Sequence, residues 1–289
     1  MVTTYGALMR QTARALEAEE GPRADFTARA LMTYLTGKDT AQLLAMQNLF
    51  LPEELAEQYQ ALAERILTGE PLAYILGQWD FYGQTYTVTP EVLIPRDDTM
   101  AVVDLILERR HLLPQNPRIL DLCTGSGCIG LTLAARIKTA RVTLADLSPG
   151  ALKIAKKNTV DQHLTARVSC LTADAMVPAS RFLGQFDVLI SNPPYVTAAE
   201  MAALPRSVRD FEPAMALDGG PDGLDFYRAI AKNFTPAIKP GGYLALEFGM
   251  GQEDAVSWIL EAWDYDILAL KKDAGDITRA ILAQKKERD

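Results

Sequence analysis

Residues from about 100 to 249 alternate between short apolar segments and longer segments with helical periodicity. The segments typical of strands read PRILDLC, ARVTLADL, ARVSCLTAD, FDVLISN and GGYLALEFG. Helical segments such as GCIGLTLAARI, SPGALKIAKKN and LDFYRAIAKNF lie between them. Strands that alternate with helices in this way predict an α/β domain with a mostly parallel sheet and helices on both of its faces.

The region before this alternation is predicted to be helical. Apolar residues recur at helical spacing in four segments of residues 1–78, with Gly21-Pro22 between the first two and Gly37 after the second. This region carries no evident catalytic groups, so we expect a helical bundle that recognises a partner. The stretch GQWDFYGQTYTVTPEVLIP follows it and alternates like a strand pair, which predicts a β-hairpin linker.

The charge balance limits the possible partners. The chain of 289 residues has a formal net charge of −8, which argues against a general nucleic-acid binder or a protein of anionic membrane surfaces. Cys123, Cys128 and Cys170 match no zinc spacing, and the only histidines are His111 and His163, so no metal site is expected. With few cysteines, no apolar leader and no run able to span a bilayer, we expect a cytoplasmic protein.

A glycine-rich loop follows the first predicted strand of the α/β region. ILDLCTGSGCIG contains the pattern G-x-G-x-x-G at Gly125, Gly127 and Gly130, and Asp146 stands at the end of the next strand. Such a loop can bind a nicotinamide dinucleotide or another nucleotide, or it can be a structural turn. Its place between a strand and a helix, with an acid that can accept from ribose hydroxyls, favours an adenosine-containing ligand.

Acidic residues at the predicted strand ends indicate which adenosine-containing ligand the loop binds. Asp121 precedes the glycines, where a pyrophosphate would be repelled and a cationic amino-acid group would be attracted. Asp174, at the expected end of the third strand, is a candidate for the adenine edge. Together with Asp146 these acids favour S-adenosyl-L-methionine over NAD, although an aspartate at a strand end is also common as a helix cap.

The fourth predicted strand ends in Asn192-Pro193-Pro194-Tyr195. An amide or exocyclic amine nitrogen is a weak nucleophile that gains positive charge when it attacks a methyl sulfonium. Two fixed acceptors, the Asn192 side-chain oxygen and the Pro193 carbonyl, would stabilise that transition state more than the ground state. The prolines offer no competing N–H, and Tyr195 could stack on a flat amide or base. The structural alternative is a proline-terminated strand with an aromatic plug.

Several longer motifs carry a resemblance to a known family. They are GQWDFYG, VLIPRDDT, SNPPYV, FEPAMALDGGPDGLDFYRAI, EFGMGQ and KDAGDITRAI, in that order. The chain resembles the bacterial release-factor glutamine methyltransferases of the HemK/PrmC type, the protein-(glutamine-N5) methyltransferases. The resemblance implies a Rossmann-like class I methyltransferase domain over residues 99–289, preceded by a helical substrate-recognition domain over 1–78 and a β-hairpin linker over 79–98.

The resemblance also implies an activity and a set of site residues. The expected reaction is S-adenosyl-L-methionine-dependent methylation of the glutamine side-chain amide in the Gly-Gly-Gln motif of class 1 peptide-chain release factors. The expected catalytic and substrate-binding residues are Asn192, Pro193, Pro194 and Tyr195, with Arg96 as a further substrate contact. The expected cofactor-binding residues are Asp121, Cys123, Thr124, Gly125, Ser126, Gly127, Asp146, Asp174, Ala175 and Asn192.

The sequence departs from the family pattern at two places. The family usually reads Pro-Arg-Pro-(Asp/Glu)-Thr-Glu, where this chain has Pro95-Arg96 followed by Asp97, Asp98, Thr99 and Met100. Cys123 stands where the family usually has the first glycine of the cofactor loop, and we expect a side chain to be tolerated there on the condition that its φ is negative. Two other functions remain open: an adenine-N6 nucleic-acid methyltransferase, which shares Asn-Pro-Pro-Tyr, and a non-catalytic module that binds an adenosine ligand.

Overall fold

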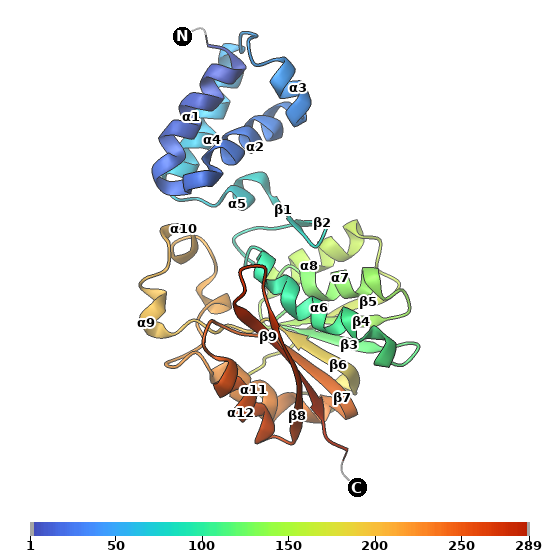
Figure 1. The fold of residues 1–289 in the computed structure, drawn as a ribbon. Coiled ribbons are helices and arrows are strands. Elements are labelled where there is room, and N and C mark those ends of the chain that lie inside the picture. Colours follow the sequence, from blue (N-terminus) through green and yellow to red (C-terminus); the bar gives the residue numbers. More distant parts are fainter. Residues whose placement is uncertain (1–2, 288–289) are drawn as a thin grey trace. The chain divides into compact units, whose positions relative to one another are not determined.

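The structure is a computed structural model that describes residues 3–287 (Figure 1). The chain divides into two compact units, and each is described by itself. One unit comprises residues up to 77 together with 205–211, and the other comprises residues 78–204 and the chain from 212 onwards.

The first unit is a helical bundle. Its helices are α1 (Tyr5–Glu20), α2 (Ala24–Thr36), α3 (Thr40–Ala45), α4 (Glu53–Leu67), α5 (Leu72–Leu76) and α10 (Arg206–Arg209). The helix boundaries follow local sequence signals: Asp39 forms a capping box with Gln42, and Gly37 ends α2 in the left-handed conformation with φ of 65°. In the core, the Tyr59 hydroxyl donates to the Ala28 carbonyl at 2.9 Å, which satisfies a fully buried phenol. The helical bundle predicted for this region is confirmed.

The second unit begins with a two-stranded hairpin, β1 (Gln78–Phe81) and β2 (Gln84–Thr87). Its turn residues Tyr82 and Gly83 both have positive φ, as two-residue hairpins require. Asn158 ties the hairpin to the main sheet domain, because its amide bonds both backbone groups of Thr87 and also donates to the Ser126 carbonyl. The hairpin thus supports the glycine loop from the side.

The main sheet has seven strands in the order β5-β4-β3-β6-β7-β9-β8. They are β3 (Arg118–Leu122), β4 (Arg141–Asp146), β5 (Val168–Thr172), β6 (Phe186–Ser191), β7 (Ile238–Glu247), β8 (Tyr265–Lys272) and β9 (Thr278–Lys285). β3 to β7 pair in parallel, whereas β9 pairs antiparallel with both β7 and β8. The predicted mostly parallel sheet is confirmed.

Helices cover both faces of this sheet, as Figure 1 shows. The remaining helices are α6 (Met100–Glu108), α7 (Cys128–Arg136), α8 (Pro149–Asp161), α9 (Ala198–Met201), α11 (Asp225–Phe234) and α12 (Glu253–Glu261). One core cluster joins α6 and α7 to one face of the central strands, and a second joins α11 and α12 to the other face. Alternate strand residues enter opposite clusters, so Ile119 lies in the first and Leu120 in the second.

Candidate active site

The chain reverses its strand order at β3, and this creates a crevice. β3 leads outward to β4 and β5, and the chain then returns to place β6 on the other side of β3. At such a switch point the connections leave in opposite directions, so the carboxyl ends of the parallel strands border an open crevice where ligands bind. A cavity lies there, lined by the glycine loop, by the ends of β4, β5 and β6, and by residues 91–99 and 213–216.

Each glycine of the loop is required for a physical reason, either its backbone conformation or a lack of space for a side chain. Gly125 and Gly127 have φ of 54° and 85°, which a residue with a side chain adopts only at a cost. Gly130 has an ordinary φ, but a Cβ there would lie 2.4 Å from a Leu144 methyl group and 2.9 Å from Asp121 Oδ2. Gly130 therefore lets α7 pack directly against the sheet, below the loop.

Asp121 supports the loop from beneath and does not line the cavity. Its side chain is fully buried, and its Oδ2 accepts from the Thr124 hydroxyl at 2.5 Å and from the Gly130 N–H at 2.9 Å. Burial raises the pKa of Asp121 to about 7, against the effect of these two hydrogen bonds. The geometry gives Asp121 a positioning role for the loop.

Asp146 and Asp174 do line the cavity. Asp146 Oδ2 accepts from the Gly125 N–H at 2.8 Å and Oδ1 from the Ser148 N–H at 2.9 Å, while Asp174 Oδ1 accepts from the Met176 N–H at 2.8 Å. Burial raises the pKa of Asp146. Both carboxylates are thus held in place by backbone donors of their own turns.

The pKa of the Cys123 thiol reflects the negative charge around this cavity. Cys123 lines the cavity, and burial together with the carboxyl groups of Asp146, Asp121 and Asp174 raises the pKa of its thiol well above the usual range. The carboxyl groups of Asp146 and Asp174 on one wall of this cavity favour a cationic ligand and disfavour a pyrophosphate.

The backbone at Cys123 has a left-handed conformation. The negative φ that was set as the condition for tolerating a side chain here is not met, because φ is 59°. The physical reason is the turn itself, which must reverse direction within the few residues between the end of β3 and α7. A glycine would adopt this conformation without the steric cost that a Cβ brings.

A pair of substitutions measures this backbone strain. We expect Cys123→Gly to be more stable than Cys123→Ala by about 1 kcal/mol, because both remove the thiol and only alanine keeps the Cβ at positive φ. Chemical denaturation of both variants without cofactor provides the measurement. Equal stabilities, or a more stable alanine variant, would show that the left-handed backbone at this position carries no strain.

The end of β6 brings Asn192 and Pro194 to the opposite wall of the cavity. Within residues 3–287 the Asn192 side chain makes one hydrogen bond, in which Nδ2 donates to Thr99 Oγ1 at 3.2 Å. Its Oδ1 accepts none. Pro193 is buried, and neither Pro193 nor Tyr195 lines the cavity.

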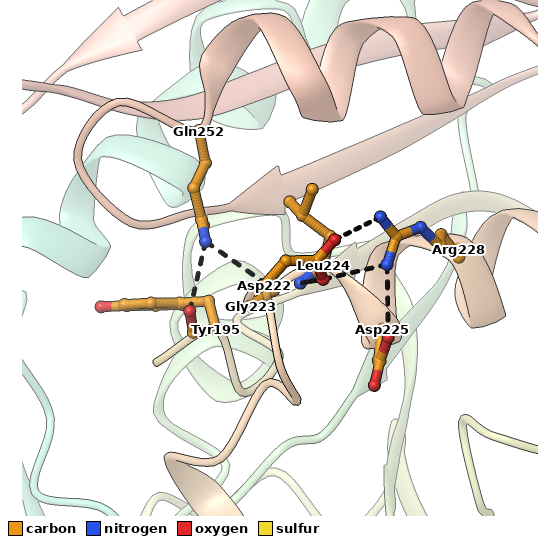
Figure 2. A network of polar contacts seen from close by, with 7 residues as sticks. All are labelled: Tyr195, Asp222, Gly223, Leu224, Asp225, Arg228 and Gln252. Atoms are coloured by element: carbon orange, nitrogen blue, oxygen red, sulfur yellow. Dashed lines mark hydrogen bonds and ion pairs between the residues drawn. The ribbon is translucent and has the colours of Figure 1, made fainter. Parts of the chain in front are cut away.

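The Tyr195 backbone packs closely against two glycines and accepts a hydrogen bond from Gln252. Figure 2 shows Gln252 Nε2 directed at the carbonyls of Tyr195 and Gly223, at 3.2 and 3.4 Å. A Cβ on Gly219 would lie 2.6 Å from Tyr195 Cα, and one on Gly223 would lie 2.4 Å from the Tyr195 carbonyl oxygen. Burial and then the nearby Glu247 carboxylate raise the pKa of Tyr195. The last residue of the Asn-Pro-Pro-Tyr segment is therefore tightly positioned, with its phenol un-ionised.

The turn that carries Gly223 is stabilised by its own ion pairs and hydrogen bonds. Arg228 pairs with Asp222 at 2.6 Å and with Asp225 at 3.3 Å, and the Leu224 N–H donates to Asp222 Oδ1 (Figure 2). These exposed contacts contribute little energy individually, but they close the turn that carries Gly223.

Arg96 lines the cavity and pairs with the buried carboxylate of Glu212. Glu212 also accepts from the Ile94 N–H at 3.0 Å, so it fixes the residues before α6 at the cavity rim. Glu212 was not predicted, although it lies in the quoted motif FEPAMALDGG. Further cavity residues, which were not predicted as site residues, include Glu91, Val92, Leu93, Pro95, Thr99, Leu147, Ala173, Met176, Met215 and Phe226.

Residues 3–287 contain neither a metal-ligand cluster nor a helix that could span a membrane. No cluster of three or more histidine, cysteine, aspartate or glutamate side chains could hold a metal ion. None of the helices in this range has the length and apolar character needed to cross a membrane.

Comparison with known proteins identifies both parts of the chain. Residues 7–77 match the PrmC N-terminal domain, and residues 103–210 match the methyltransferase small domain. A crystal structure of a methyltransferase from Pyrococcus furiosus superposes with a TM-score of 0.52 and 16% identity, over 80% of this chain and 98% of that one. This likeness supports the methyltransferase fold.

Similarity to curated sequences is closer. A release factor glutamine methyltransferase from Moorella thermoacetica is 39% identical over 259 residues, which is 90% of each chain. One from Geobacter sulfurreducens is 44% identical over 207 residues, covering 71% of this chain and 69% of the relative. The chain belongs to the release factor glutamine methyltransferase family.

Proposed function

We propose that this protein transfers a methyl group from S-adenosyl-L-methionine to the glutamine side-chain nitrogen of the Gly-Gly-Gln motif in class 1 peptide-chain release factors. The observation that supports this most is that Asn192 and the glycine loop line one cavity, together with Asp146. A site with an acidic cofactor wall and an amide oxygen opposite suits methylation of a weak nitrogen nucleophile. The family membership agrees with this activity.

The acidic wall fits the proposed cofactor. S-Adenosyl-L-methionine supplies an electrophilic methyl group on a cationic sulfonium. Asp146 would accept from the ribose hydroxyls, and Asp174 with Ala175 would meet the adenine. Residues Cys123 to Gly127 would carry the amino-acid portion, with Asp121 holding their loop from below. The carboxyl groups of Asp146 and Asp174, which line the cavity, would favour the positive charge of such a ligand.

The substrate amide would meet Asn192 on the cavity wall. As the glutamine nitrogen attacks, its N–H groups become better donors, and the Asn192 Oδ1 would accept from one of them. This acceptor needs no reorganisation during the reaction, since Asn192 is held by Thr99 and the Tyr195 carbonyl accepts from Gln252. The Pro193 carbonyl, predicted as a second acceptor, belongs to a buried residue that does not line the cavity. No general base is required before attack, because the proton can leave after the nitrogen has become positive.

The rest of the chain would select the substrate. We propose that the helical domain over residues 1–78 grips the release factor, with the hairpin linker over 79–98 before the methyltransferase domain over 99–289. Arg96, at the cavity rim, would contact the approaching Gly-Gly-Gln segment.

Mass spectrometry of a release factor provides the test. After incubation with the protein and S-adenosyl-L-methionine, we expect one added methyl group on the glutamine of Gly-Gly-Gln. A release factor with that glutamine replaced by alanine is the matched control and should gain none. An unmodified peptide at saturating cofactor would reject the proposal, and methyl transfer to DNA or RNA instead would favour the adenine-N6 alternative.

A further inference from the structure

One glutamine side chain links three turns at the carboxyl ends of β6 and β7. Gln252 is the residue before α12, and its Oε1 accepts from the Gly249 N–H at 2.9 Å. Its Nε2 donates to the carbonyls of Tyr195 and Gly223 at 3.2 and 3.4 Å (Figure 2). These partners lie in the turn after β7, in the Asn-Pro-Pro-Tyr segment after β6 and in the turn before α11. Since β6 and β7 are neighbours in the sheet, Gln252 joins the segments that follow two adjacent strands.

The three partners fix the orientation of the Gln252 amide. A backbone N–H can only donate, and a backbone carbonyl can only accept. If the amide were flipped, its NH₂ would face the Gly249 N–H and its oxygen would face two carbonyls, so all three hydrogen bonds would be lost. The side chain is therefore held in one orientation by groups that do not titrate.

The Asn-Pro-Pro-Tyr segment is stiff, so its position depends on its two ends. Pro193 and Pro194 have no N–H to donate, and each proline restricts the residue before it to an extended backbone. Asn192 and Pro194, the two members of the segment that line the cavity, lie between the end of β6 and Tyr195. Strand pairing at Ser191 fixes the first end, and the hydrogen bond from Gln252 holds the carbonyl at the second.

Glycines leave the space in which Gln252 makes these contacts. A Cβ on Gly223 would lie 2.6 Å from Gln252 Nε2, and Gly223 has φ of 72°. A Cβ on Gly249 would lie 3.1 Å from Gln252 Oε1 and 3.1 Å from Tyr195 Cδ2. Gln252, Gly223 and Gly249 do not line the cavity. The contact is thus made by residues that lie behind the site, and it reaches the site through the Tyr195 backbone.

We propose that Gln252 is a positioning residue that sets the methyl-transfer rate by holding the Tyr195 end of the segment that carries Asn192. This inference rests on the proposed function, in which the Asn192 oxygen accepts from the substrate nitrogen. Without the Nε2 donor, the segment can turn about the end of β6 and displace that oxygen. A misplacement of about 1 Å can lower a rate about 100-fold. The glycine loop forms the opposite wall, so cofactor affinity should change little.

Two substitutions at Gln252 separate its donor from its acceptor in a methyl-transfer assay. Gln252→Glu keeps the length and an oxygen for the Gly249 N–H but loses the donor, whereas Gln252→Met loses both. We expect each to lower the single-turnover rate about 10–100-fold while the cofactor dissociation constant changes less than about threefold. If only Gln252→Met is slow, the Gly249 contact and not the Tyr195 carbonyl carries the effect, and the proposal is wrong.

The matched control is a glutamine that makes the same kind of bond elsewhere. Gln284 in β9 is half-buried like Gln252, and its Nε2 donates to the Gly241 carbonyl at 2.9 Å. Gln284→Glu should therefore keep the wild-type rate and cofactor affinity. A rate loss in this control as large as that in Gln252→Glu would show that the effect is not specific to the Asn-Pro-Pro-Tyr segment.

A double-mutant cycle separates positioning from a general loss of structure. In an Asn192→Ala background there is no acceptor to position, so Gln252→Glu should lower the rate no further than about twofold. Equal rate losses in both backgrounds would show that Gln252 does not act through Asn192 and would overturn the proposal.

A spectroscopic readout needs no substrate. Tyr195-Val196 is the only Tyr-Val pair in the sequence. With ¹³C in the tyrosine carbonyls and ¹⁵N in the valines, a spectrum that correlates each amide with the preceding carbonyl therefore contains one signal. We expect the Tyr195 carbonyl carbon to shift in both Gln252 variants and to stay in place in Gln284→Glu.

The outcomes distinguish this inference from the proposed function. An unshifted Tyr195 carbonyl in the Gln252 variants, or a shifted one with wild-type transfer rates, would overturn the positioning role. A wild-type protein that methylates no release factor would instead refute the proposed function, and the carbonyl signal would still decide whether Gln252 holds the segment.

Discussion

Asn192→Ala is expected to lower the methyl-transfer rate by about 10²–10³ while the cofactor dissociation constant stays within about tenfold. The substitution removes an acceptor whose hydrogen bond strengthens as the substrate nitrogen becomes positive, so the loss falls mainly on the transition state. It leaves intact the glycine loop and the Asp146 contacts on the other side of the cavity. Single-turnover rates at saturating S-adenosyl-L-methionine, with calorimetric cofactor binding, give the two quantities.

The control for this experiment is an asparagine outside the site. Asn116 lies exposed in the turn before β3, and Asn116→Ala should match the wild type in both measurements. If Asn192→Ala reacts at a near-normal rate, the acceptor model is wrong. If instead cofactor affinity falls by about 100-fold with an unchanged rate, Asn192 acts as a cofactor ligand and not as a transition-state acceptor.

Asp146→Ala should chiefly weaken cofactor binding, with a dissociation constant about 10–100-fold higher and a rate at saturation near that of the wild type. The carboxylate has two tasks that both concern the ground state. It would accept from the ribose hydroxyls, and it holds the backbone of the loop through the Gly125 N–H at 2.8 Å and the Ser148 N–H at 2.9 Å. Isothermal titration of the cofactor measures the loss.

A matched variant divides the two tasks of Asp146. Asp146→Asn keeps the shape and one oxygen acceptor but removes the negative charge. We expect its dissociation constant to lie between those of the wild type and the alanine variant. An unaltered affinity in Asp146→Ala would mean that the ligand does not reach the end of β4, and the proposed cofactor position would be wrong.

The local sequence was sufficient for much of the fold. Ser148-Pro149 begins α8 because the serine oxygen accepts from Ala151 N–H and proline suits the first helical turn. β6 ends before Pro193 because neither proline can donate to a ladder. The last antiparallel pair was not predicted, although β8 alternates strictly between inward and outward residues, because only the arrival of β9 beside β7 shows where that pair attaches.

The acidic residues at the strand ends predicted a ligand site at this edge of the sheet, but they did not predict the role of each residue in it. Asp121 was expected at the ligand, yet it follows Ile119 with a period of two and therefore points to the same face of the sheet, beneath α7. Which face α7 covers is a tertiary property, and it decides that this carboxylate supports the loop. A side chain at Cys123 was expected to be tolerated only at negative φ, because side chains normally avoid the left-handed region, but the geometry of the turn overrides that preference.

By itself the sequence determined the alternating strands and helices, the glycine loop and the rigid Asn-Pro-Pro-Tyr segment, because each depends on residues adjacent in the chain. Only the tertiary structure decided that Thr99 and Asn192, which are 93 positions apart in the numbering, meet at the wall of the cavity. Hydrogen bonds at the ends of parallel strands depend on sheet order and on side-chain direction. Both are set by packing between distant segments, which leaves no periodic signal in the sequence.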